Sequence, residues 1–173
     1  MSSEKRQITQ SSKLAGVRYD VRGPILQEAE RLERAGEKIL KLNIGNPAPF
    51  GFEAPPEIVD AVARALPDAE GYSDSRGILA SREAVARHYA ELGVPDVDAS
   101  DVYLGNGVSE LISLVLQALV SHGDEILVPS PDYPLWTAQV TLQGGHAIHY
   151  PCDESNGWMP DLEVIESLVT PRT

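Results

Sequence analysis

VYLGNGVSELISLVLQALVSHGDEILVPSPDY, residues 102–133, carries the pattern of apolar residues from which the fold class is predicted. A short apolar run at 102–104 predicts a strand, and a strongly apolar segment at 108–120 predicts a helix. A second apolar run at 125–128 predicts another strand, which ends at a proline-rich loop. Strands separated by helices of this length are typical of β-α-β units, so the stretch predicts a parallel sheet.

The alternation continues toward the C-terminal end. Helices are predicted at 133–142 and 161–168, with a strand at 147–150 between them. The segment at 108–120 is apolar on nearly all sides, which predicts a buried helix. Three parallel strands are few for this architecture, and the helix at 161–168 should lead to a fourth. We therefore expect an incomplete α/β architecture, and the simplest interpretation is a fragment.

The residues before this part predict helices and loops. Apolar spacing, with proline near the starts and glycine near the ends, predicts helices at 24–36, 56–66 and 78–92. The alternating letters ILKLNI predict a short strand at 39–44. The polar first dozen residues are expected to form a mobile arm.

The composition disfavours several classes of protein. The 173 residues hold 14 Lys and Arg against 26 Asp and Glu, a net charge of -12, which disfavours non-specific binding to nucleic acid. No run of about 18 apolar residues is present, so we expect no membrane span. The polar N-terminus lacks the apolar core of a secretory signal. A single cysteine, Cys152, cannot form a disulfide framework, and a reducing cytoplasm fits best.

A candidate anion site lies at the turn between the first predicted strand and the apolar helix. Gly105 and Gly107 allow close backbone approach, and the helix N-terminus at Val108 and Ser109 offers N–H donors and a hydroxyl to a phosphate. The motif match is weak, because Glu110 stands where GxGxxG requires glycine and no P-loop lysine follows. A glycine-rich tight turn without a ligand is the alternative.

Two loops next to predicted strands are further candidates. Ser130–Pro134 (SPDYP) holds Tyr133 between two prolines, where its ring could stack on a planar cofactor or pack into the core near Trp136. In NIGNP at 43–47, Gly45 permits close backbone approach to a ligand, or is part of an ordinary turn.

A polar loop, EGYSDSRG at 70–77, carries a tyrosine and an arginine. The hydroxyl of Tyr72 and the guanidinium of Arg76 are both good phosphate ligands. The alternative is a solvated loop. Other reactive residues do not combine: the spacing of His146, His149 and Cys152 alternates faces of a strand, so we expect no metal site.

Taken together, these segments resemble one family. NIGNP at 43–47, GYSDSRGILASREAVARHY at 71–89, YLGNGVSELI at 103–112, PSPDYPLW at 129–136 and TPRT at 170–173 are similar to the N-terminal part of a class I/II, fold-type I, pyridoxal-phosphate-dependent aminotransferase. GYSDSRG, GNGVSEL and DYPLWTA most resemble the alanine (glutamate–pyruvate) transaminase branch.

The resemblance implies roles for single residues. Gly107, Val108 and Ser109 would hold the cofactor phosphate, and Tyr133 would stack on the pyridine ring. Gly45 would offer its backbone to the substrate carboxylate. Tyr72 would reach the cofactor phosphate of a second subunit, which implies a homodimer across which the N-terminal arm packs.

The resemblance also implies a domain organisation. Residues 1–20 would form the flexible arm, 21–66 a helical part of the small domain, and 67–173 the first part of the cofactor-binding large domain. That large domain would be a three-layer α/β structure with an incomplete parallel sheet.

One requirement of the family is missing from the chain. A transaminase needs a lysine that binds the cofactor covalently, and no lysine follows Lys41. Arg172 is the only arginine after Arg87, so the usual grip on a substrate carboxylate is not apparent either. We therefore assign no catalytic residue.

The resulting hypothesis is the N-terminal part of an aminotransferase of amino-acid biosynthesis. It would exchange an amino group between an amino acid, alanine or glutamate, and a 2-oxo acid, while the 173 residues alone would be inactive. Two alternatives stay open: a non-catalytic interaction or regulatory module on the same framework, and an unrelated nucleotide-binding α/β domain.

Overall fold

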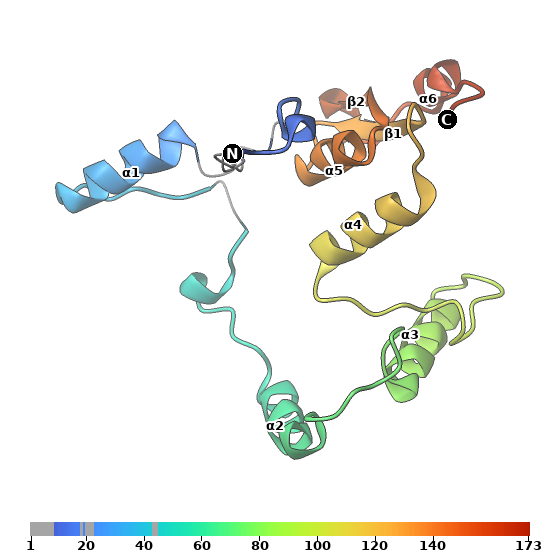
Figure 1. The fold of residues 1–173 in the computed structure, drawn as a ribbon. Coiled ribbons are helices and arrows are strands. Elements are labelled where there is room, and N and C mark those ends of the chain that lie inside the picture. Colours follow the sequence, from blue (N-terminus) through green and yellow to red (C-terminus); the bar gives the residue numbers. More distant parts are fainter. Residues whose placement is uncertain (1–8, 18, 20–22, 43–44) are drawn as a thin grey trace, which may run out of the picture. The chain divides into compact units, whose positions relative to one another are not determined.

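The computed structural model describes residues 9–17, 19, 23–42 and 45–173 (Figure 1). The chain forms two compact units. Unit 1 consists of Met1–Tyr19 and Gly105–Thr173, and unit 2 consists of Asp20–Leu104. The domain boundaries predicted after residues 20 and 66 concern the domains of an intact aminotransferase and stay predictions.

Unit 1 contains the alternating part of the chain. Its elements in chain order are η1 (Ser12–Leu14), α4 (Val108–Leu119), β1 (Glu125–Ser130), α5 (Leu135–Gln143), β2 (His146–Asp153), η4 (Glu154–Asn156), β3 (Met159–Pro160) and α6 (Leu162–Leu168). The predicted helices and the two later predicted strands are all confirmed, and each observed end lies within three residues of the predicted one.

The sheet of unit 1 is small and mixed. β1 and β2 are parallel, in a register that pairs Glu125 with His146, which confirms the predicted β-α-β unit. β3 pairs with β2 in the antiparallel direction, with Cys152 opposite Pro160. The sequence did not predict β3, because two residues carry no periodic pattern.

The strand predicted at 102–104 is absent from the structure. These residues are described but belong to no sheet, and the N–H of Leu104 donates instead to the carbonyl oxygen of Arg76, at 2.9 Å. A strand requires a partner that completes a ladder of hydrogen bonds. An apolar run supplies the side chains of a strand but not that partner.

The core of unit 1 lies between α4, α5 and the sheet. α5 packs on β1 and β2, and α4 packs on α5 (Figure 1). α5 ends at Gly144 with φ 85°, where the N–H of Gly145 donates back to the Val140 carbonyl. The central cluster consists of Ile112, Leu116, Leu135 and Val140.

The prediction that the apolar helix is buried is wrong for this chain. Only Ile112 and Leu116 of α4 are buried. Four other apolar residues of the helix are between 48% and 75% exposed: Val108, Leu114, Val115 and Leu119. A helix that is apolar on all sides needs neighbours on every side to be buried. Within the described part of unit 1, the main neighbour of α4 is α5, which covers one side of it.

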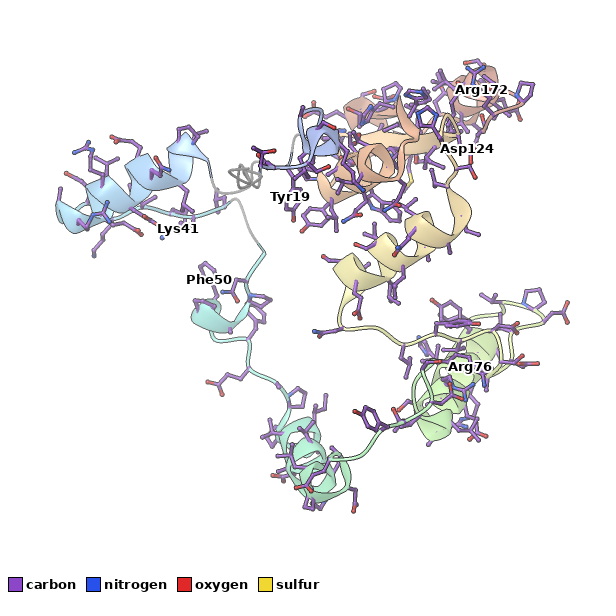
Figure 2. All side chains as sticks on the ribbon, viewed as in Figure 1. Tyr19, Lys41, Phe50, Arg76, Asp124 and Arg172 are labelled. Atoms are coloured by element: carbon purple, nitrogen blue, oxygen red, sulfur yellow. The ribbon has the colours of Figure 1, made fainter. Side chains whose placement is uncertain are left out.

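The C-terminal turn of unit 1 is tied to the start of β1. The buried carboxylate of Glu125 accepts hydrogen bonds from the hydroxyl of Thr170 and from the guanidinium of Arg172, which Figure 2 labels. The N–H of Glu125 also donates to the Arg172 carbonyl oxygen, at 2.8 Å. Side-chain and backbone bonds therefore join segments 47 residues apart.

Unit 2 consists of helices and loops. Its elements are α1 (Pro24–Arg34), η2 (Ala48–Phe50), α2 (Pro56–Ala65), η3 (Leu66–Asp68) and α3 (Leu79–Glu91). Pro24 begins α1, where its missing N–H costs nothing, and Gly36 at φ 93° follows its end, as predicted. Within the described residues of this unit, Val102 and Arg82 are the buried side chains.

The strand predicted at 39–44 is not found at 39–42, which belong to no sheet, and 43–44 lie outside the described residues. The reason is the same as at 102–104, since no strand among the described residues pairs with this segment. Over the described ranges, no helix is long and apolar enough to cross a membrane.

Candidate functional site

The turn before α4 has the backbone conformation that the predicted phosphate site needs. Gly107 adopts φ 80° and ψ 165°, a region that only glycine occupies readily, and α4 begins at the next residue. A Cβ on Gly105 would lie 2.7 Å from the Cδ2 atom of Leu111, so that position also excludes larger residues. Gly107 is therefore required for its backbone conformation, and Gly105 is required because a side chain would not fit.

Donors at the start of α4 are available to an anion. No acceptor within the described structure binds the backbone N–H of Val108 or Ser109, and the Ser109 hydroxyl makes no hydrogen bond. These groups lie at the positive end of the helix dipole. The arrangement therefore fits a phosphate, which needs several convergent donors.

Glu110 occupies the same helix end. Its carboxylate accepts a hydrogen bond from the N–H of Asn106, so the side chain folds back over the turn. A carboxylate in the first turn is stabilised by the helix dipole, but it repels an incoming phosphate. The turn thus carries one internal negative charge beside its free donors.

Tyr133 is presented rather than buried. It follows β1 directly and is 45% exposed, whereas its neighbour Trp136 packs against the core of unit 1. Its hydroxyl lies 2.7 Å from that of Tyr19, and the two rings meet edge to face, with centroids 6.2 Å apart. Packing of Tyr133 into the core is therefore excluded, and its ring remains accessible for stacking.

Asp132, next to Tyr133, has an unsatisfied carboxylate oxygen. Its Oδ2 atom is buried and has no hydrogen-bond partner in the structure. Burial raises the pKa of Asp132, and the nearby His149 opposes that rise. Asp132 is not among the residues predicted from the sequence, although its position between two prolines and beside Tyr133 was a signal in the sequence.

The loop at 70–77 in unit 2 divides into an open and a closed part. Tyr72 is fully exposed. Two residues later, Asp74 binds the guanidinium of Arg76 through two side-chain hydrogen bonds of 3.2 and 3.0 Å, and the Arg76 N–H donates to it as well. These bonds lower the pKa of Asp74 to about 2.

The pairing changes the interpretation of Arg76. Its charge is neutralised by Asp74, so it does not offer an open guanidinium to a phosphate in this structure. Tyr72 keeps its hydroxyl exposed. Of the two phosphate ligands considered in this loop, the structure therefore leaves the tyrosine accessible.

The residue that fastens this loop is not among those predicted from the sequence. Arg82, in α3, is 5% exposed and donates to the carbonyl oxygens of Gly77 and Ala99. In the sequence, its charge gives it the character of an ordinary surface residue. Only the folded structure shows that it is buried.

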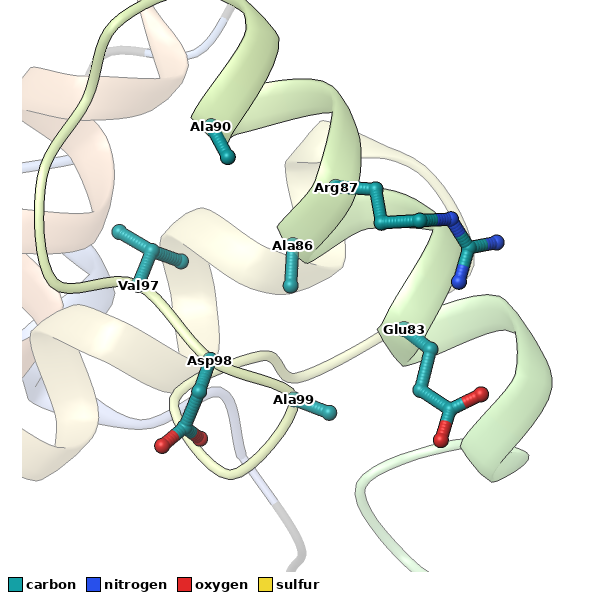
Figure 3. A pocket seen from close by; sticks show the side chains of 7 residues that line it. All are labelled: Glu83, Ala86, Arg87, Ala90, Val97, Asp98 and Ala99. Carbon is teal, nitrogen blue, oxygen red and sulfur yellow. The ribbon is translucent and has the colours of Figure 1, made fainter.

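A groove of about 320 Å³ lies between α3 and the segment 97–99. Figure 3 shows Ala86 and Ala90 facing Val97 across it, whereas the side chain of Arg87 points away. Because methyl groups form most of this lining, the groove lacks the convergent polar groups that orient a charged cofactor. We do not count it as part of the candidate site.

The candidate residues fall into the two units. Gly107, Val108, Ser109 and Tyr133 belong to unit 1, while Gly45 and Tyr72 belong to unit 2. Gly45 has open space around it, since a Cβ there would meet no atom within 4 Å. Among the described side chains, no cluster of three or more His, Cys, Asp or Glu residues could hold a metal ion.

The fold and the glycine turn define a class of protein. Unit 1 has a parallel β-α-β unit with an aromatic loop after its first strand, and before that unit stands a helix whose N-terminus follows a glycine turn. The solved structures that the chain resembles are fold-type I aminotransferases, and the arrangement agrees with part of their large domain. The chain belongs to the family described as aminotransferase class I and II, which matches residues 37–173. Enzymes of this family depend in general on pyridoxal 5'-phosphate. Membership excludes an unrelated nucleotide-binding domain.

Within this family, the chain is similar to alanine and glutamate-pyruvate aminotransferases. The chain is 60% identical over 166 residues to the glutamate-pyruvate aminotransferase AlaA of Escherichia coli K12, covering 96% of the chain and 41% of that protein. It is 58% identical over 170 residues to the alanine aminotransferase of Mycobacterium tuberculosis H37Rv, covering 98% and 40%. The crystal structure of an aminotransferase from Escherichia coli superposes with a TM-score of 0.89 at 59% identity, covering 97% of the chain and 42% of that structure. The chain thus spans about two fifths of the length of these relatives.

Proposed function

We propose that these residues form the N-terminal part of an aminotransferase that exchanges an amino group between alanine or glutamate and a 2-oxo acid. The observation that carries the proposal is the glycine turn with free donors at the start of α4, in a chain that is 60% identical to a glutamate-pyruvate aminotransferase. The enzyme would act in amino-acid biosynthesis in the cytoplasm.

The cofactor phosphate would be held at the turn before α4. Val108 and Ser109 supply two backbone donors and a hydroxyl, and Gly107 supplies the conformation that turns them outward. Glu110 lies in the same first turn, so its carboxylate would have to rotate away or pair with another donor when phosphate binds. When bound, pyridoxal 5'-phosphate would supply the electron sink that amino-group transfer requires.

Tyr133 would cover one face of the cofactor ring. The bond from its hydroxyl to that of Tyr19 limits displacement of the ring from the loop, and the edge-to-face contact with the Tyr19 ring limits rotation of the ring plane. Stacking depends on the plane of the aromatic, so a fixed ring loses less freedom on binding than a mobile one. Tyr19 therefore supports the stacking that Tyr133 would perform.

The two remaining residues concern the substrate and a second subunit. Gly45 would present its backbone to the carboxylate of the amino acid or 2-oxo acid. Tyr72 would reach the cofactor phosphate bound by the other copy in a homodimer. Its complete exposure supports this role, because a side chain that serves another subunit makes few contacts with its own.

The covalent anchor of the cofactor is not among these 173 residues. The four lysines all lie within the first 41 positions, before the segment that carries the phosphate turn. The residues described above can bind, orient and stack, but they offer no amine for attachment of the cofactor. We therefore expect the 173-residue chain by itself not to catalyse transfer.

The test compares the protein of natural length with the 173-residue chain. With pyridoxal 5'-phosphate, L-alanine and 2-oxoglutarate, the natural-length protein should form pyruvate and glutamate. The short chain should form neither and should lack the visible absorbance of a lysine-bound cofactor. Absence of transfer from alanine or glutamate by the natural-length protein would refute the proposed reaction.

The short chain also tests the alternative of a non-catalytic module. A module must fold alone, and the exposed apolar face of α4 argues against that. We expect a broad melt and self-association of the purified chain. A sharp cooperative melt with a defined dimer would favour the module instead.

A further inference from the structure

Arg82 holds three parts of unit 2 together. Its Nε donates to the carbonyl oxygen of Gly77 at 2.9 Å, and its Nη1 donates to that of Ala99 at 2.6 Å. Its Nη2 lies 3.5 Å from the Asp74 carboxylate. The side chain is 6% exposed, so these contacts replace nearly all of the water that a guanidinium would otherwise bind.

The segment that Arg82 holds is further tightened by two local features. The carbonyl oxygen of Arg76 accepts from the N–H of Leu104, at 2.9 Å. Gly77, at φ 101°, packs so closely that an added Cβ would lie 2.6 Å from the Leu104 side chain. The chain from Asp74 to Gly77 is therefore anchored by a buried charge, a backbone bond and close packing.

Tyr72 stands just outside this anchored segment. Its side chain is fully exposed, and the described structure gives it no hydrogen bond or ring contact of its own. Two residues of extended chain reach at most about 7 Å, so the position of Asp74 limits where Tyr72 can be. With no contacts at the ring, the loop anchor is what restricts the hydroxyl.

We propose that Arg82 is a positioning residue for Tyr72, which it presents to the cofactor phosphate by fixing the segment from Asp74 to Gly77. This inference rests on the proposed function, because it requires that Tyr72 binds phosphate. Arg82 itself contacts neither cofactor nor substrate. It acts through the carbonyl oxygen of Gly77 and the carboxylate of Asp74.

The chemistry of the side chain explains why arginine serves here. The planar guanidinium directs separate N–H donors at two carbonyl oxygens and one carboxylate at once. A lysine ammonium is a point charge on a flexible stem and reproduces fewer of these directions. Arg82→Lys should therefore keep the charge while loosening the loop.

The test is a double-mutant cycle of Arg82→Lys and Tyr72→Phe in the protein of natural length. We measure the dissociation constant for pyridoxal 5'-phosphate and for pyridoxal, which lacks the phosphate. Arg82→Lys should weaken binding of pyridoxal 5'-phosphate by about tenfold, and this effect should largely disappear in the Tyr72→Phe background. Binding of pyridoxal should change little.

Two further variants control for the fold. Arg87→Lys, on the exposed side of the same helix, should leave both dissociation constants unchanged. Asp74→Asn removes the carboxylate contact while the bonds to both carbonyl oxygens remain. It should show the same coupling to Tyr72, to a smaller degree, even if Arg82→Lys proves too unstable to purify.

The outcomes separate the two proposals. If Tyr72→Phe weakens cofactor binding but the effects of Arg82→Lys and Asp74→Asn add to it without coupling, the positioning role is refuted and the proposed function stands. If Arg82→Lys weakens the binding of pyridoxal and of pyridoxal 5'-phosphate equally, Arg82 has a structural role only and the positioning role is refuted. If the unaltered protein binds no pyridoxal 5'-phosphate, the proposed function itself fails.

Discussion

The hydroxyl oxygens of Tyr19 and Tyr133 lie 2.7 Å apart, although 114 residues separate them in the chain. The contact brings the end of the N-terminal segment to the loop after β1 within unit 1. The segment around η1 also packs on α5, so the tyrosine pair is one of several contacts there. It connects the residue that the sequence marked for stacking with one that the sequence did not mark.

Tyr19→Phe should weaken cofactor binding several-fold while leaving the fold intact. It removes one hydroxyl and keeps the ring, at a cost of about 1 kcal/mol for a hydrogen bond. Titration of the natural-length protein with pyridoxal 5'-phosphate measures the change. Tyr133→Phe removes the same bond from the other side, so the double variant should be little worse than either single one. Full additivity would show that the bond does not connect the two residues functionally.

Gly107→Ala should disrupt the phosphate turn. Its φ of 80° and ψ of 165° lie in a region that a side chain occupies only with strain of about 1–3 kcal/mol. We expect weaker cofactor binding and a lower midpoint of thermal unfolding. Gly157→Asn is the matched control, because Gly157 at φ 64° and ψ 31° lies in the left-handed region that asparagine tolerates. Equal losses of cofactor affinity and thermal stability in the two variants would contradict a requirement for glycine at position 107.

Glu125→Gln should destabilise the C-terminal turn. The carboxylate accepts from the hydroxyl of Thr170 and then from Arg172, and these bonds lower the pKa of Glu125. Exchange for the amide removes the charge that attracts Arg172 while keeping the size of the side chain. Urea unfolding should show a lower midpoint, and hydrogen exchange should rise at 170–173. If hydrogen exchange at 170–173 stays unchanged, the backbone hydrogen bond from Glu125 to Arg172 is enough to hold the turn.

Asp74 should titrate well below an ordinary aspartate. Hydrogen bonds from the Arg76 side chain and backbone lower its pKa from 3.8 to about 2. Because the pKa is lowered in the folded state, its stabilising effect is complete above pH 3.8 and is lost as the pH falls toward 2. Carbon-detected NMR of the carboxyl group measures the value. Arg76→Gln should return the pKa toward 3.8, and a midpoint unaffected by this exchange would contradict the pairing.

Helix positions were largely readable from the sequence because their signals are local. Proline begins α1, and glycine after α1 and α5 adopts the left-handed conformation that ends a helix. The glycine turn before α4 was readable for the same reason, since glycine spacing and a following helix are adjacent in the chain, while its role as a phosphate site stays a prediction. Such features depend on neighbours within a few residues.

Strands and burial were readable only in part, because both depend on distant partners. The apolar runs at 102–104 and 39–42 have the composition of strands, but no strand in the described part of the chain pairs with them. The helix α4 has the composition of a buried helix, but several of its apolar side chains are exposed in the described structure. In each case the residues are suited to pairing or burial, but whether this occurs depends on other segments of the fold.

The family resemblance, the order of the helices and the glycine turn before α4 could all be inferred from the amino-acid sequence. The tertiary structure alone decided that Tyr133 is held by Tyr19, that Asp74 neutralises Arg76, and that Arg82 is buried beneath the Tyr72 loop. The physical reason is the range of the interactions. Backbone conformation is set by adjacent residues, whereas hydrogen bonds between side chains and the burial of a charge exist only after distant segments have come together.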